Sequence, residues 1–217
     1  MTEPLVIPRH LGYIIDGNRR WAKQHGLPTY EGHLAGYNVL KEVALENLSL
    51  GVEYMSIYIF STENWSRSQQ EVKGLMSLIL RLFTTDADMF DSYNVRLKVL
   101  GGRDRLDIKI LKAIDSLEAR TANNTAGTLV ICLNYGGQSE IVDAVKAIVR
   151  SGVDADDITA VDMIVRTSGE KRLSNFMLWR AAYSEFLFLD KLWPDMTKED
   201  VTAIIKEYSK RNRRFGG

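Results

Sequence analysis

An acid and two arginines lie close together near the N-terminus of this 217-residue chain, where a predicted strand passes into a predicted helix. The apolar run 11–15 is typical of a buried strand, and the turn-forming residues 16–18 (Asp-Gly-Asn) end it. Arg19 and Arg20 then open the helix. Helix N-termini favour anions, and arginine can grip a phosphate with two parallel hydrogen bonds. The segment therefore predicts a phosphate site, and the structural alternative is a turn with solvated arginines.

Asp16 points to a metal ion as well, because an acid is out of place in an anion-binding loop unless a divalent cation bridges it to a phosphate. We therefore expect Mg²⁺ at this loop. The sequence carries no Walker lysine motif, no G-x-G-x-x-G after the first strand and no Cys/His cluster with zinc spacing. These features indicate a phosphorylated ligand outside the common ATP and NAD folds.

Predicted strands and helices alternate, which favours a single α/β domain over residues 1–217, with a central, mostly parallel sheet and helices on both faces. The predicted strands are 11–15, 52–60, 95–100, 128–133, 161–165 and 186–189, and the predicted helices are the one from 19 towards 26, 34–50, 69–91, 106–122, 141–149 and 198–210. Polar loops follow the strands, where open α/β sheets place their ligands. We therefore expect one crevice to gather Asp16, Ser61, Asn64, Arg67, Arg166 and Arg172.

The bulk composition narrows the class of protein. The hydrophobic fraction of 45% and the charged fraction of 26% are those of a globular protein. A formal net charge of zero argues against nucleic acid as a partner. The single Cys132 excludes an internal disulfide, and the first residues lack the features of a signal peptide. We therefore predict a cytoplasmic protein.

The predicted helix 69–91 carries more apolar residues than one core contact needs, among them Leu75, Leu78, Ile79 and Leu82. Burial on two sides is the usual reason for such a helix. Beside a phosphate-binding mouth, an apolar tunnel for a long hydrocarbon becomes the favoured interpretation.

Seven stretches give a more specific prediction: 16–22 (DGNRRWA), 32–33 (GH), 60–65 (FSTENW), 134–137 (NYGG), 166–176 (RTSGEKRLSNF), 193–194 (WP) and 213–217 (RRFGG). In type and order they resemble those of the cis-prenyltransferases, the undecaprenyl diphosphate synthase family, over essentially the whole chain. The resemblance implies a Mg²⁺-dependent homodimer that joins an allylic prenyl diphosphate to isopentenyl diphosphate and forms a Z double bond. Membrane contact is expected only if the product is long.

The same resemblance implies roles for single residues. Asp16 and Glu185 would be the Mg²⁺ ligands, while Asp16, Ser61 and Asn64 would take part in catalysis. Trp21 is counted among the substrate-binding residues, with the alternative that it only anchors its helix. The tail 213–217 would reach the phosphate site of the partner subunit. The full expected substrate-binding set is Gly17, Asn18, Arg19, Arg20, Trp21, His33, Trp65, Arg67, Glu71, Arg166, Arg172 and Ser174.

Three departures from the family pattern bear on the product. Thr29 stands where most members carry an arginine aimed at the allylic diphosphate, and Ile59 stands where long-chain members commonly have alanine. The link 151–160 is shorter than usual by about one helix. We therefore expect a short- or medium-chain product. One alternative is head-to-middle condensation with dimethylallyl diphosphate, which gives a branched, lavandulyl-type diphosphate. A second alternative, of a different class, is a non-catalytic subunit that binds prenyl diphosphates.

Overall fold

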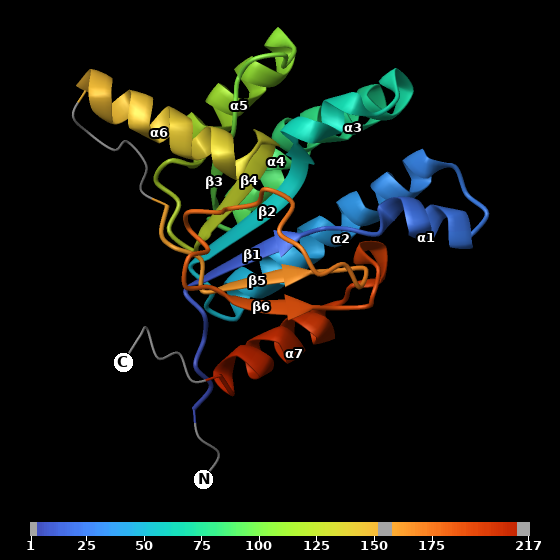
Figure 1. The fold of residues 1–217 in the computed structure, drawn as a ribbon, viewed down its shortest axis with the longest axis vertical. Helices are drawn as coiled ribbons and strands as arrows, with labels where there is room; N and C mark the ends of the chain where they lie inside the picture. The colour runs from blue at the N-terminus through green and yellow to red at the C-terminus, as the bar shows by residue number, and fades with distance from the viewer. Residues whose placement is uncertain (1–3, 152–157, 212–217) are drawn as a thin grey trace.

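A six-stranded sheet forms the centre of the fold, with the strand order β3-β4-β2-β1-β5-β6 (Figure 1). The computed structural model describes residues 4–151 and 158–211. The strands are β1 (His10–Ile14), β2 (Tyr54–Ser61), β3 (Arg96–Leu100), β4 (Thr128–Tyr135), β5 (Met163–Arg166) and β6 (Glu185–Phe188). Neighbouring strands are all paired in parallel. The expected single α/β domain with a parallel sheet is confirmed, and the carboxyl ends of its strands meet at one edge.

The helices lie at the expected positions, although α2 and α6 begin four or five residues earlier than expected and one predicted helix is broken in two. They are α1 (Asn18–Gln24), α2 (Thr29–Ser49), α3 (Gln69–Phe83), α4 (Ala87–Ser92), α5 (Ile108–Thr121), α6 (Gly137–Ser151) and α7 (Lys198–Ser209), with short 3₁₀ helices η1 (Thr62–Ser66) and η2 (Trp193–Asp195). The single helix expected over 69–91 is wrong, because the chain leaves the helix at Thr84 and starts α4 after Asp86. Threonine is a poor helix former, and the Thr84 hydroxyl donates back to the Leu80 carbonyl at 2.7 Å. The segment expected as a polar loop after β2 is the 3₁₀ helix η1.

The two faces of the sheet are covered differently. Buried side chains of α2, α3, α4, α5 and α7 form one large core with the first face. The second face is covered by irregular segments within 158–181, which contribute Val161, Phe176, Met177 and others. The expectation of helices on both faces is therefore corrected: positive φ angles at Ser174, Asn175 and Met177 show a chain that turns instead of forming a helix.

Helix α6 begins just after β4 and extends away from the sheet (Figure 1). Most of the shortened link, residues 152–157, lies outside the described residues, as does the tail 213–217. Within the described part of the chain, no helix has both the length and the apolar character needed to cross a membrane.

Candidate active site

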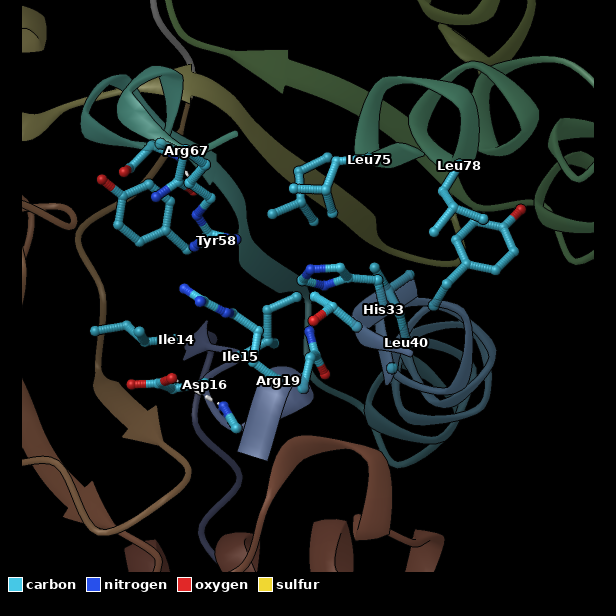
Figure 2. Close-up of a pocket in the computed structure, with 18 of the residues that line it drawn as sticks. Ile14, Ile15, Asp16, Arg19, His33, Leu40, Tyr58, Arg67, Leu75 and Leu78 are labelled. Carbon is cyan, nitrogen blue, oxygen red and sulfur yellow. Dashed lines mark hydrogen bonds between the residues drawn. The ribbon is translucent and has the colours of Figure 1, made fainter. Parts of the chain in front are cut away.

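A cavity of about 1230 Å³ opens at the carboxyl ends of β1, β2 and β5 and is walled by α2 and α3. Its lining changes in character along its length. Figure 2 shows Asp16, Arg19 and Arg67 towards one side and Leu40, Leu75 and Leu78 towards the other. Helix α3 contributes a stripe of Leu75, Leu78, Ile79 and Leu82, at the helical spacing of one face. The apolar tunnel expected beside a polar mouth is therefore present.

The backbone of the Asp16 loop is held by segments far along the chain. The Asp16 carbonyl accepts hydrogen bonds from the Thr167 hydroxyl at 2.6 Å and the Trp193 amide at 3.1 Å. Gly17 follows with a φ of +114°, and a Cβ there would lie 3.1 Å from the Leu192 Cα. Only glycine combines this conformation with this close approach. The loop is therefore rigidly placed at the sheet edge.

The carboxylate of Asp16 faces the cavity with its orientation set by two donors. Oδ1 accepts the Gly17 amide at 2.8 Å, and Oδ2 accepts Arg166 Nη2 at 2.9 Å. The Asp16 side chain is 35% exposed, whereas that of Arg166 is only 4% exposed. A buried arginine thus fixes a carboxylate that remains accessible from the cavity.

Arg166 occupies the end of β5 and organises the loop that follows it. It donates to the Ser174 hydroxyl at 2.8 Å and to the Arg172 carbonyl. Its Nε has no hydrogen-bond partner among the described residues, and neither has the buried Asn18 Oδ1. Buried polar atoms are rarely left unpaired, so these two atoms leave hydrogen-bonding capacity for a ligand or water at the cavity.

Two glycines let α1 and α2 approach closely enough to bring their polar residues together. A Cβ at Gly32 would lie 2.1 Å from the Asn18 carbonyl oxygen, and one at Gly36 would lie 2.3 Å from Asn18 Oδ1. His33, between these glycines, is consequently buried beside the cavity. The sequence reasoning identified His33 but did not explain its glycine neighbours.

His33 and Arg67 share one carboxylate partner. Glu71 Oε1 lies 3.1 Å from His33 Nε2 and 2.9 Å from Arg67 Nη1. Burial lowers the pKa of His33 and so favours the neutral imidazole. The hydrogen bond and the charge of Glu71 act in the opposite direction but do not outweigh burial. Burial acts to raise the pKa of Glu71, but the His33 hydrogen bond and the charges of Arg67 and Arg19 lower it overall. Glu71 does not line the cavity, so it acts on the cavity only through the two lining residues that it bonds, His33 and Arg67.

The mouth of the cavity, defined here as the part lined by charged and amide groups, is strongly cationic. Its basic lining residues are Arg19, Arg20, Lys23, Arg67 and Arg166. Arg20 also contacts Ser168 and Glu170. Arg172 pairs with Glu170 at 2.5 Å, is more than half exposed and does not line the cavity. The sequence reasoning missed Lys23, although its place four residues after Arg19 puts both on one helix face.

Ser61 and Asn64 line the cavity at the end of β2. They form a capping box at the start of η1, in which Asn64 Oδ1 accepts the Ser61 amide at 3.1 Å. Glu63 and Asn175 also line the mouth, and their side chains are joined by a hydrogen bond of 3.1 Å. Glu63 was expected among the acids of the crevice, whereas Asn175 was not.

Two tryptophans expected to bind substrate do not line the cavity. The Trp21 indole donates to Asp195 at 2.7 Å and stacks on His25, which supports the alternative that it anchors its helix. The Trp65 indole donates to Asn134 at 2.7 Å, and its ring packs edge-on against Phe60. Both rings therefore fasten segments that carry lining residues.

Glu185 lies at the opposite end of the sheet from Asp16. It begins β6, level with Met163 and, through it, with Leu11. The strand from Leu11 to Ile14 spans about 10 Å, and the turn that carries Asp16 follows it. Glu185 pairs with Arg211 at 2.8 Å instead. The expectation that these two carboxylates hold one ion is therefore not met within a single chain.

The cationic mouth and the apolar interior together define a site for a phosphorylated ligand with a hydrocarbon tail. A family model described as "Putative undecaprenyl diphosphate synthase" matches residues 14–216. The isoprenyl transferase of Thermotoga maritima is 43% identical over 97% of both chains, and the decaprenyl diphosphate synthase of Mycolicibacterium smegmatis is 40% identical over 97% of this chain and 78% of its own. The chain therefore belongs to the undecaprenyl diphosphate synthase family, and it is a cis-prenyltransferase.

A solved structure agrees with this assignment over the whole fold. The lavandulyl diphosphate synthase from Lavandula x intermedia, in complex with dimethylallyl diphosphate, superposes with a TM-score of 0.90 at 30% identity. The match covers 97% of this chain and 99% of that one. Prenyl diphosphates are thus the substrates that the family and the site indicate in common.

Proposed function

We propose that the chain condenses an allylic prenyl diphosphate with isopentenyl diphosphate in a Z-type elongation that yields a short- or medium-chain product. The observation that carries this proposal is that five basic side chains lead directly into an apolar compartment of the same cavity. The mouth suits two diphosphates, and the compartment suits the growing hydrocarbon. Holding both substrates in one orientation supplies the proximity that a bimolecular condensation needs.

The residues at the mouth fit a Mg²⁺ ion. Mg²⁺ in proteins is often bound by one or two carboxylates together with substrate phosphates and water. Asp16 offers a carboxylate that is accessible from the cavity and oriented by Arg166. We therefore assign Asp16 as the protein ligand of the ion. When bound, Mg²⁺ supplies positive charge that stabilises the departing diphosphate.

The chain's own residues divide into two groups at the mouth. Gly17, Asn18, Arg20 and His33 would contact the allylic diphosphate, and Arg166, Arg172 and Ser174 would grip the isopentenyl diphosphate. Cationic groups fixed before the reaction stabilise the negative charge that develops on the leaving diphosphate. The allylic carbon–oxygen bond breaks, the double bond of isopentenyl diphosphate attacks the allylic carbon, and a proton leaves. In this scheme Arg172 exchanges its ion pair with Glu170 for the substrate.

A product assay tests the proposal. Purified protein with Mg²⁺ is offered dimethylallyl, geranyl or farnesyl diphosphate, with and without isopentenyl diphosphate, and the dephosphorylated alcohols are analysed by mass spectrometry. Linear alcohols that need isopentenyl diphosphate are the expected result. Binding of prenyl diphosphates without any turnover would contradict the proposal and support a non-catalytic binding subunit.

Branched condensation is the second candidate, and one residue favours it. Thr29 lines the mouth at the position where most family members carry an arginine for the allylic diphosphate. One cation fewer changes how that diphosphate is held. In the same assay, branched alcohols formed from dimethylallyl diphosphate alone would favour head-to-middle condensation.

Ile59 supports a limited product length from the sheet side of the cavity. The register between β2 and β4 shifts between Tyr58 and Phe60, so Ile59 lies in a bulge and lines the cavity. Bulges redirect side chains at strand ends. We expect Ile59→Ala to lengthen the longest product by one or more five-carbon units, measured by the same mass spectrometry. An unchanged length distribution would show that Ile59 is no constriction.

We also propose that the protein is a homodimer, assembled through α6 and the adjoining segment. Val142, Val145, Ile148 and Val149 recur at helical spacing on α6 and are all exposed, Val149 by 80%. Trp179 and Tyr183 are also largely exposed, and the ion pair of Arg180 with Glu140 joins their segment to α6. Exposed apolar surface of this kind typically marks a protein interface.

The dimer predicts a mass in solution of twice 24.6 kDa by sedimentation equilibrium. Val145→Asp places a charge in the middle of the apolar stripe and is expected to shift the protein towards the monomer. Lys146→Asp, on a neighbouring polar position, serves as the matched control. A monomeric wild-type protein at micromolar concentration would contradict the proposal.

A further inference from the structure

Tyr37 closes the gap between the two helices that wall the cavity. Helix α2 starts at the mouth with Thr29 and reaches Tyr37 eight residues later, about 12 Å along its axis. Helix α3 runs inward from the mouth in the same way, and Leu82, near its end, is its last lining residue. The Tyr37 hydroxyl donates to Asp86, in the turn that follows α3. The side chain therefore spans from α2 to the inner end of α3.

The ring of Tyr37 is held by charged groups that do not themselves line the cavity. Asp86 Oδ2, which accepts the tyrosine hydroxyl, also lies 3.1 Å from Lys41 Nζ and 3.9 Å from Arg81 Nε. The same two cations lie over the ring, with Lys41 Nζ at 4.8 Å and Arg81 Cζ at 5.6 Å from its centroid. A cation over an aromatic face is attracted to it.

We propose that Tyr37, fixed by Asp86, forms the inner wall of the hydrocarbon compartment and sets the longest chain that the cavity accepts. This inference rests on the proposed function, since it concerns the tail of the same prenyl diphosphate. It differs from the constriction at Ile59, which lies on the sheet side of the cavity.

The charged anchor is what makes Tyr37 a fixed wall. Leucine side chains such as Leu40 and Leu82 can change rotamer under an incoming chain without losing a hydrogen bond. Tyr37 can move aside only by giving up a hydrogen bond to a charged carboxylate in a partly buried site. Burial acts to raise the pKa of Asp86, but the hydrogen bonds from Tyr37 and Lys41 lower it overall, so the carboxylate stays charged at neutral pH.

Two measurements test the wall. The first is the product assay with the wild-type protein and the variants Tyr37→Ala, Tyr37→Phe and Asp86→Asn. The second needs no turnover: the affinity of each protein for geranyl, farnesyl and geranylgeranyl diphosphate is measured by isothermal titration calorimetry with Mg²⁺. Tyr13→Phe is the matched control, because it removes a buried hydroxyl that bonds Asn47 at 3.0 Å outside the cavity.

Tyr37→Ala is expected to lengthen the longest product by at least one five-carbon unit and to tighten binding of the longest diphosphate relative to the shortest by roughly tenfold. Tyr37→Phe keeps the ring but removes the hydroxyl that bonds Asp86, and Asp86→Asn keeps an acceptor oxygen but removes its negative charge. Both variants weaken the anchor, so their products should spread towards longer chains. Tyr13→Phe should match the wild type in both measurements. An unchanged length preference in all three cavity variants would overturn the inference. If Tyr37→Ala does not fold, an unchanged length preference in Tyr37→Phe and Asp86→Asn is enough to overturn it.

The two proposals fail in different ways. A wild-type protein that forms no product contradicts the proposed condensation, whereas the binding series still reports whether Tyr37 limits chain length. If the wild-type protein forms product and the cavity variants form products of the same length, the proposed condensation stands and the proposed role of Tyr37 is wrong.

Discussion

Asp16→Asn is expected to lower kcat by roughly 10³-fold, on the scale of losing one preorganised charged group at a reacting diphosphate. The substitution keeps the size of the side chain and one acceptor oxygen, so that one of the two hydrogen bonds, from Gly17 or from Arg166, is retained. It removes the negative charge with which Asp16 would hold Mg²⁺, and leaves the cations of the mouth in place. The loss should therefore fall on turnover far more than on the fold.

Steady-state kinetics with farnesyl and isopentenyl diphosphates over a range of Mg²⁺ concentrations measure this effect. A higher Mg²⁺ requirement together with the fall in kcat would link Asp16 to the ion. Asp88→Asn is the control, since Asp88 is an exposed aspartate that pairs with Arg120 at 2.7 Å away from the cavity. A rate within twofold of the wild type for Asp16→Asn would remove the assigned role.

Arg166→Ala is expected to reduce kcat/KM for isopentenyl diphosphate by roughly 10²- to 10³-fold. It deletes the group that orients Asp16 and also bonds the Ser174 hydroxyl and the Arg172 carbonyl. Because these partners lose a buried donor, the free energy of unfolding should fall as well, by roughly 1–3 kcal/mol.

Arg166→Lys separates the two effects. Lysine keeps the positive charge but lacks the planar fork that serves several partners at once. We expect Arg166→Lys to recover part of the stability, measured by urea unfolding, and little of kcat/KM. If the lysine variant is as active as the wild type, a point charge suffices there and the multiple hydrogen bonds of Arg166 are not needed.

The fold was predictable where the signal in the sequence is local. The Asp-Gly-Asn turn ends β1 because of its own turn chemistry, and the alternation of strands and helices predicts a parallel sheet. The break at 84–86 was not, because the apolar pattern continues across it and tertiary contacts of Asp86 with Tyr37 and Lys41 accompany the new start. The covering of the second sheet face by irregular chain instead of a helix has no local signal either, since it depends on how 173–181 turns.

The site was predictable to the extent that it follows from strand ends. Asp16, Ser61 and Arg166 meet because the carboxyl ends of parallel strands share one edge. The same rule, applied to Glu185, would have placed it at the opposite edge, since it precedes the predicted strand 186–189. The outward turn of Trp21 and Trp65 depends on Asp195 and Asn134, distant partners that no spacing reveals.

The two distant hydrogen bonds that hold the Asp16 carbonyl have a consequence for folding during synthesis. Strand β1 leaves the ribosome first, yet it lies between β2 and β5 in the finished sheet. The hydrogen-bond donors to the Asp16 carbonyl are synthesised much later: Thr167 follows 151 residues after Asp16, and Trp193 later still. A nascent chain that ends before these residues carries the Asp-Gly-Asn turn without the contacts that hold it. We therefore expect the site to form late in synthesis, when the C-terminal segments have docked, and a chain truncated before Thr167 to be inactive even with every mouth residue from β1 and β2 in place.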